Sequence, residues 1–177
     1  MTVCLWLVRH GSTDSTDARR FLGWKDEPLN VNGVRQAEEL RKSLRDQSFQ
    51  SVWSSDLERA VRTAESITQE VHIDPRLREV DVGLLEGKTW EECDPFTQEG
   101  LLRFEGFRFP GGESVDELRA RVEDVLGEID EPGDHLVVTH GGVIRLLLRR
   151  IGDDRSIPPG ELVAVDWPQS ASFFYSK

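Results

Sequence analysis

Residues 3–11 read VCLWLVRHG, and this segment dictates much of the architecture. Its first six residues form a continuous apolar run, which is typical of a strand buried on both faces of a sheet. Residues 136–142 read LVVTHGG and repeat the order of apolar run, histidine and glycine. Because parallel strands bring their carboxyl ends to one edge of a sheet, we expect His10 and His140 to meet there.

Strand and helix patterns alternate along the rest of the chain. Short apolar runs predict further strands at residues 52–53, 162–167 and 172–176. Periodic apolar positions predict helices over residues 32–44, 57–71 and 114–129, and a further helix that follows Gly141 and Gly142 and runs through Leu146 to Arg150. This alternation predicts an α/β fold, with a mostly parallel sheet covered by helices on both faces in a three-layer α/β/α arrangement.

Local patterns also predict where the helices begin and end. Asn32 is expected to cap the first helix, and Val34 is then expected on its buried face. Capping boxes are expected at Ser55 with Glu58 and at Ser114 with Glu117, and a C-terminal glycine at Gly152.

Composition narrows the class of protein. The chain has 177 residues, the size of one domain, and we expect a single domain over residues 1–177. It carries 22 Lys and Arg against 33 Asp and Glu, a net charge of −11, which argues against nucleic-acid or anionic-membrane partners. The first apolar run is too short for a signal peptide or a membrane span. Cys4 and Cys93 lack CxxC spacing, so we expect neither a disulfide framework nor a zinc site. We therefore expect the protein in the reducing cytoplasm.

Three segments offer polar side chains at strand ends. Arg9 and His10, followed by Gly11, suit an anion-binding turn, although a surface turn would read the same. His140 repeats this layout, and Arg59 lies in the first turn of a predicted helix. From the pattern alone Arg59 could be a solvated helix residue, and Arg62 lies on nearly the same face. The four histidines lack metal-ligand spacing, so no metal is expected.

Together these segments resemble the histidine phosphatase superfamily, also called the phosphoglycerate mutase-like family. The resemblance covers nearly the whole chain, because six blocks follow one another with fitting gaps. The blocks are LVRHGST at 7–13, GWKDEPL at 23–29 with GVRQA at 33–37, SSDLERA at 54–60 with TA at 63–64, LREVDVG at 77–83 with EG at 86–87, PGGES at 110–114 and VTHGG at 138–142.

The resemblance implies a role for each catalytic position. His10 matches the nucleophile that becomes phosphohistidine, and Glu79 matches the proton donor. Arg9, Arg59 and His140 match the groups that hold the phosphoryl oxygens, where positive charge offsets the charge of the transferred group. Asp81 and Glu86 are nearby carboxylates that compete with Glu79 for its role. The resemblance implies no cofactor.

Five further positions are expected to bind substrate, namely Thr13, Thr16, Leu22, Gly23 and Gly141. Two of them depart from the family pattern. Thr16 stands where many members carry asparagine, and its hydroxyl can still donate a hydrogen bond to phosphate. Leu22 stands where the family usually has a polar residue, which makes the pocket wall more apolar. Both departures affect which substrate the site is expected to bind, and they leave the expected phosphoryl-transfer reaction unchanged.

Three functions stay open. A phosphomonoester hydrolase acting on a small phosphorylated metabolite is favoured, because residues 88–109 form only a short, aromatic cap and lack the paired arginines of a mutase. The short format is similar to that of α-ribazole phosphate phosphatases and of broad-specificity monoesterases. A phosphoglycerate mutase is the first alternative. A catalytically inactive member that binds phosphorylated ligands is the second, although such members typically lose the nucleophile.

Overall fold

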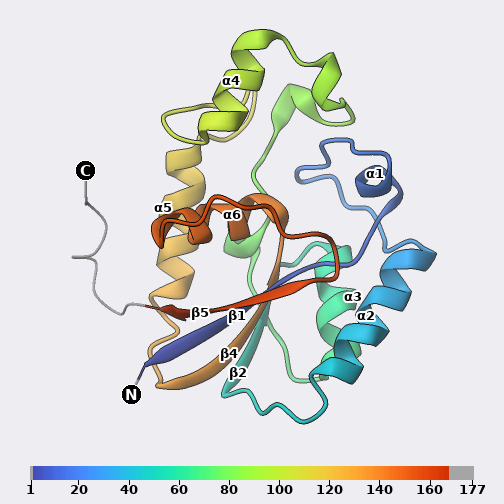
Figure 1. The fold of residues 1–177 in the computed structure, drawn as a ribbon, viewed down its shortest axis with the longest axis vertical. Helices are drawn as coiled ribbons and strands as arrows, with labels where there is room; N and C mark the ends of the chain where they lie inside the picture. Colours follow the sequence, from blue (N-terminus) through green and yellow to red (C-terminus); the bar gives the residue numbers. More distant parts are fainter. Residues whose placement is uncertain (1, 168–177) are drawn as a thin grey trace.

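A five-stranded sheet forms the centre of the computed structural model, which describes residues 2–167. The strand order is β3-β2-β4-β1-β5, and the first four strands are parallel, whereas β5 runs antiparallel to β1 (Figure 1). The predicted mostly parallel sheet is therefore confirmed. The strands are β1 (Val3–Arg9), β2 (Ser51–Ser54), β3 (His72–Ile73), β4 (Gly133–Thr139) and β5 (Leu162–Trp167).

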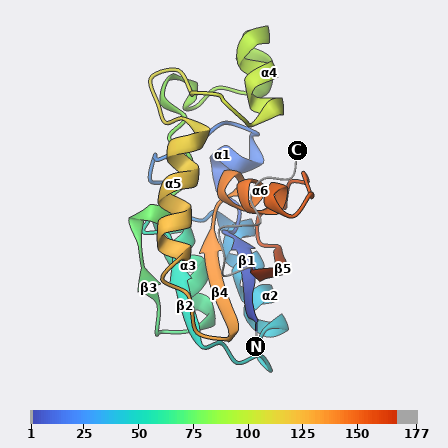
Figure 2. The same ribbon diagram turned by 90° about the vertical axis from the view of Figure 1, so that its left-hand side faces the viewer.

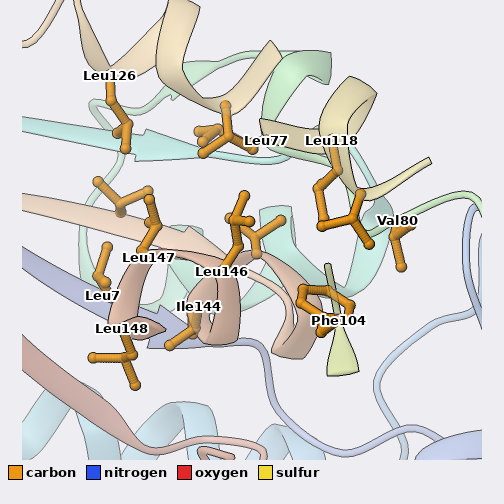
Figure 3. Close-up of a cluster of buried hydrophobic side chains, with 14 of the residues drawn as sticks. Leu7, Leu77, Val80, Phe104, Leu118, Leu126, Ile144, Leu146, Leu147 and Leu148 are labelled. Atoms are coloured by element: carbon orange, nitrogen blue, oxygen red, sulfur yellow. The ribbon is translucent and has the colours of Figure 1, made fainter. Parts of the chain in front are cut away.

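Helices cover both faces of the sheet (Figures 1 and 2). Side chains along β1 alternate between the two faces, so Leu7 joins one core cluster and Val8 joins the other. Figure 3 shows Leu7 together with Leu118 of α5 and Ile144 of α6 in the larger cluster. Helices α2 (Val31–Ser43) and α3 (Glu58–Ile67) cover the Val8 face, and α5 (Val115–Leu126) and α6 (Gly141–Arg150) cover the Leu7 face.

Short helical segments lie in the connections. In Figure 2, α4 lies at the opposite end of the molecule from the start of β1. Among residues 2–167, no helix is both long and apolar enough to cross a membrane. The short segments are α1 (Asp14–Asp17), α4 (Pro95–Arg103) and the 3-10 helices η1 (Pro75–Leu77), η2 (Gly83–Leu85) and η3 (Trp90–Glu92).

Two predicted helix starts are wrong. Helix α2 is capped by Asn30, whose side chain accepts a hydrogen bond from the Gly33 amide, and not by Asn32. Val34 is then 49% exposed instead of buried. Helix α3 has no side-chain cap, so the capping box of Ser55 and Glu58 does not form. This helix ends at Ile67, short of the predicted residue 71.

Other local predictions hold. Ser114 and Glu117 form the predicted capping box of α5. Gly152 follows the end of α6 with a φ of +81°, a conformation that glycine adopts without strain. Strand β4 begins at Gly133, three residues before the predicted start. The strand expected at 172–176 lies outside the described residues.

Candidate active site

Two imidazole rings meet at the carboxyl edge of the sheet, as the repeated strand–histidine pattern predicted. His10 directly follows β1, and His140 directly follows β4, the neighbouring parallel strand. Their ring centroids lie 5.0 Å apart in an edge-to-face arrangement. Both side chains are buried. The two rings therefore share a small region shielded from bulk water.

The hydrogen bonds of His10 define which ring nitrogen carries its proton. Nδ1 lies 2.7 Å from the Gly11 carbonyl oxygen, which can only accept, so Nδ1 carries the hydrogen. Nε2 accepts a hydrogen bond from Nε of Arg59 at 3.2 Å, so it keeps its lone pair. Burial, and then the charges of Arg59 and Arg9, hold the pKa of His10 well below 6.5. His10 is thus a neutral imidazole whose Nε2 can act as a nucleophile.

Arg59 is only 1% exposed, and three hydrogen bonds from its guanidinium hold it in place. Besides the bond to His10, its Nη1 donates to the Lys25 carbonyl and its Nη2 to the Gly23 carbonyl, both at 2.8 Å. Gly23 has a φ of +55°, and a Cβ there would lie 2.7 Å from Cγ2 of Val82. The residue that presents this carbonyl must therefore be glycine. Arg62, the competing arginine, is instead exposed and paired with glutamates of its own helix.

Two buried nitrogens beside His10 have no protein partner within residues 2–167. One is Nε of Arg9, whose Nη1 donates to the Ile157 carbonyl at 2.8 Å. The other is Nδ1 of His140, whose Nε2 lies 2.8 Å from the Ser55 hydroxyl. Buried polar atoms are almost always hydrogen-bonded. Both nitrogens therefore keep an unused hydrogen-bonding position in the described part of the chain.

Glu79 places a carboxylate at the N-terminus of α6. The Gly142 amide donates to Oε1 and Oε2 at 3.0 and 3.1 Å, and the Val80 amide donates to Oε1 at 3.0 Å. The positive end of the helix dipole favours a negative group at this position. The Glu79 carbonyl accepts hydrogen bonds from Nε1 of Trp24 at 2.6 Å and Nη2 of Arg121 at 2.8 Å. Backbone and side chain of Glu79 are therefore both held in place.

A cavity of about 300 Å³ opens onto these groups. Glu79 is the only carboxylate among its described lining residues, which separates it from the competitors Asp81 and Glu86. The lining residues are Arg9, His10, Thr16, Arg20, Phe21, Leu22, Gly23, Arg59, Glu79, Val80, Val82, Trp90, Leu101, Leu102, Phe104, Phe109, Gly141, Gly142, Arg145 and Ser156.

Most residues expected at the site lie on this cavity, but two do not line it. His140 lies beside His10 and is fully buried. Thr13 is also buried, and it forms a capping box with Thr16 that starts α1. Thr16 lines the cavity, but its hydroxyl already donates to the Thr13 carbonyl at 3.0 Å. Both hydroxyls therefore have structural bonds, whatever contacts they make with substrate.

Three polar lining residues were not expected from the sequence. Arg20 and Ser156 lie in irregular segments and carry no local signal. Arg145 follows Gly141 by four residues on α6, so helical periodicity could have placed it on the same face as Gly141. Arg103 and Arg108 of the segment 88–109 do not line the cavity, and they pair with Glu99 and Glu117.

Comparisons with known proteins identify the family to which this fold belongs. The family model of the histidine phosphatase superfamily (branch 1) matches residues 5–166. "Probable phosphoglycerate mutase GpmB" of Proteus mirabilis is 38% identical over 160 residues, which cover 83% of this chain and 74% of that protein.

Two solved structures share the fold. Phosphoglycerate mutase from Thermus thermophilus has a TM-score of 0.85 and 46% identity, with 94% of each chain covered. A candidate alpha-ribazole-5'-P phosphatase from Escherichia coli has a TM-score of 0.81 and 29% identity, with 96% of this chain and 92% of that chain covered. The chain belongs to the histidine phosphatase superfamily, branch 1.

Proposed function

We propose that this protein hydrolyses a small phosphomonoester through a phosphohistidine formed on His10. The observation that carries this proposal is the unprotonated Nε2 of a neutral, buried His10 beside two arginine cations. Nε2 attacks the phosphorus atom, and the bond between phosphorus and the oxygen of the alcohol breaks. Nε of Arg9, the Arg59 guanidinium and Nδ1 of His140 are suited to bind the phosphoryl oxygens.

We assign the proton transfers to Glu79. As a carboxylic acid it gives its proton to the departing alkoxide, which leaves as the alcohol. As a carboxylate it then takes a proton from a water molecule that attacks the phosphohistidine. This second step releases inorganic phosphate and returns His10 to its neutral form. The position of Glu79 on the cavity wall supports both steps, and two backbone amides hold its side chain in place.

An apolar or aromatic alcohol fits the part of the cavity beyond the phosphoryl group. The cap, residues 88–109, supplies Trp90, Leu101, Leu102, Phe104 and Phe109 to its wall. Phe21, Leu22 and Val82 continue this apolar surface from the body of the protein. We therefore expect the enzyme to select substrates by burial of apolar area, in which each buried CH₂ contributes about 0.8 kcal/mol.

The names of several relatives favour a second candidate, a phosphoglycerate mutase. A mutase must bind the carboxylate of the glycerate and keep water from the phosphohistidine. Beyond the His10 cluster, the described lining residues offer two cations, Arg20 and Arg145. Arg145 already has protein partners for most of its donors. This wall favours hydrolysis of an apolar ester over transfer between positions of an acid.

A panel of phosphomonoesters tests the proposal. The purified chain is incubated with p-nitrophenyl phosphate, α-ribazole phosphate, sugar phosphates and 3-phosphoglycerate, and inorganic phosphate is measured. We expect phosphate release from p-nitrophenyl phosphate and α-ribazole phosphate, whose alcohols carry an aromatic ring, and none from the His10→Ala variant. Conversion of 3-phosphoglycerate to 2-phosphoglycerate faster than phosphate release would establish the mutase instead. No turnover of any ester would favour a phospho-ligand-binding protein.

A further inference from the structure

We propose that Arg145 is a specificity-determining residue that positions the cap against the catalytic end of the sheet. The inference rests on the proposed function in one respect, namely that the leaving group lies against the cap. Arg145 lies on α6 three residues after Gly142, whose amide binds the Glu79 carboxylate. Residues three apart share a helix face, so Arg145 projects toward the cavity that it lines, from the helix whose first turn binds the candidate acid.

Arg145 binds the last turn of α4, which forms part of the cavity wall. Its Nη1 donates to the Leu101 carbonyl and its Nη2 to the Leu102 carbonyl, both at 2.8 Å. Carbonyls in the last turn of a helix lack partners inside the helix, and a cation there also faces the negative end of the helix dipole. The same guanidinium lies over the Phe104 ring, with Cζ 4.9 Å from its centre. One side chain thus contacts three residues of the wall, Leu101, Leu102 and Phe104.

The contacts with Asp154 extend this arrangement to a second segment. Nε of Arg145 donates to Oδ1 of Asp154 at 2.8 Å. Asp154 begins a short stretch that supplies Ser156 to the cavity. The stretch ends near Ile157, whose carbonyl accepts the hydrogen bond from Nη1 of Arg9. Arg145 therefore connects α6, the cap and the segment that holds a phosphate-binding arginine.

Two of the groups that Arg145 binds are main-chain carbonyls of the cap, which supports a positioning role. The forked guanidinium uses Nε, Nη1 and Nη2 on the protein itself, and a lysine could not satisfy two carbonyls and a carboxylate in this geometry. The loss of Arg145 should free the end of α4, so that Leu101, Leu102 and Phe104 no longer form a fixed wall. The effect should therefore depend on the size of the leaving group.

Kinetics with two esters test this inference. Arg145→Met is compared with wild type on 1-naphthyl phosphate, whose leaving group reaches the cap, and on methyl phosphate, whose leaving group does not. We expect the ratio of kcat/KM between naphthyl and methyl esters to fall about tenfold, mainly through KM for the naphthyl ester, because several charge-assisted hydrogen bonds are lost. Arg145→Lys should restore part of this ratio.

Arg149→Met is the matched control. Arg149 lies on the same helix and also binds Asp154, at 2.6 Å, but among residues 2–167 its side chain forms no hydrogen bond or ion pair with the cap. This variant should keep the wild-type ratio of kcat/KM. Hydrogen exchange followed by mass spectrometry should show faster exchange over residues 95–104 in Arg145→Met and not in Arg149→Met.

Two results would overturn the inference. Equal losses of kcat/KM on both esters would show that Arg145 acts on the phosphoryl group. Unchanged exchange over residues 95–104 would show that it does not hold the cap. If wild type hydrolyses neither ester, the proposed function fails instead, and the exchange measurement still decides whether Arg145 positions the cap.

Discussion

Replacing Glu79 with glutamine should slow hydrolysis of an alkyl phosphate far more than hydrolysis of p-nitrophenyl phosphate. An alkyl alkoxide must be protonated as its bond to phosphorus breaks, whereas p-nitrophenolate is a weak base that leaves without a proton. Glu79 is the only carboxylate among the described cavity-lining residues, so within the described site no other side-chain acid can replace it. The loss of a general acid typically costs about 10²- to 10⁴-fold. We expect a loss of that size in kcat/KM for the alkyl ester only.

The structure indicates that this substitution leaves the fold intact. Oε1 of Glu79 accepts from the Val80 and Gly142 amides, both at 3.0 Å, and the amide oxygen of glutamine can keep both bonds. What is lost is the 3.1 Å contact of Gly142 with Oε2, where glutamine places an NH₂ group. One lost hydrogen bond costs about 1 kcal/mol in the free energy of unfolding. A thermal unfolding measurement checks this.

The comparison depends on kcat/KM and not on kcat. Glu79 is also proposed to activate water in the second step, so kcat would fall alike for both esters if that step limits turnover. The ratio kcat/KM reports steps up to the first irreversible one, which here is formation of phosphohistidine with loss of the alcohol. Glu86→Gln changes an exposed carboxylate outside the cavity lining and should behave as wild type. Equal losses of kcat/KM on the two esters would refute the assignment of Glu79 as the acid.

Three further predictions concern the nucleophile and its surroundings. His10→Ala should abolish turnover without unfolding the protein, and acid-quench labelling should trap phosphate on wild type only; label on the variant would place the nucleophile elsewhere. Activity should persist in EDTA, because Arg9 and Arg59 supply the positive charge at His10, and recovery of a lost activity by Mg²⁺ would contradict this. Burial holds the pKa values of His10 and His140 well below 6.5, so below that pH the unfolded chain binds protons that the folded chain does not. The contribution of these two histidines to the free energy of unfolding is therefore fully present above pH 6.5. As the pH falls below 6.5, the free energy of unfolding decreases by up to about 1.4 kcal/mol per pH unit for each histidine. Urea unfolding between about pH 7.5 and 5 should show this slope, and it should be shallower in His10→Ala; equal slopes in the two proteins would count against it.

Where the sequence predicted the fold correctly, a strong local signal agreed with the tertiary structure. Strand β1 and the second half of β4 (Leu136 to Val138) are apolar runs because helices cover both faces of the sheet at its centre. The capping box of Ser114 and Glu117 forms because no other group among residues 2–167 competes for the Ser114 hydroxyl. The capping box depends only on residues three positions apart, and a strand buried on both faces shows as an apolar run. Both features can therefore be recognised in the sequence before the fold is known.

The wrong helix starts have causes that lie far away in the sequence. Asn30 and Asn32 can both cap a helix, and the choice follows from contact with the turn after β1. The Asn30 amide donates to the Ser12 carbonyl at 3.0 Å, and a Cβ on Gly33 would lie too close to that same oxygen. The Ser55 hydroxyl is bound by His140, 85 residues later, at 2.8 Å. Local patterns cannot detect such partners.

The cavity wall was less predictable than the catalytic cluster for the same reason. The ends of parallel strands place His10 and His140 together once the strand order is known. The positions of Arg20, Arg145 and Ser156 depend instead on how the cap and the segment before β5 pack, which no local period encodes. The sequence pattern therefore predicts the cluster around His10 and His140, but it does not predict the cavity wall that contacts the rest of a substrate.

The arrangement of charge explains how an acidic protein can bind a phosphate. The net charge is −11, but charges on the surface are screened beyond about 10 Å at ordinary salt. Inside the site the cations Arg9 and Arg59 face one carboxylate, Glu79, and burial makes their local field strong. These two cations also help to hold the pKa of His10 low, which keeps Nε2 unprotonated. The same pair of side chains can thus prepare the nucleophile and bind the group that it attacks.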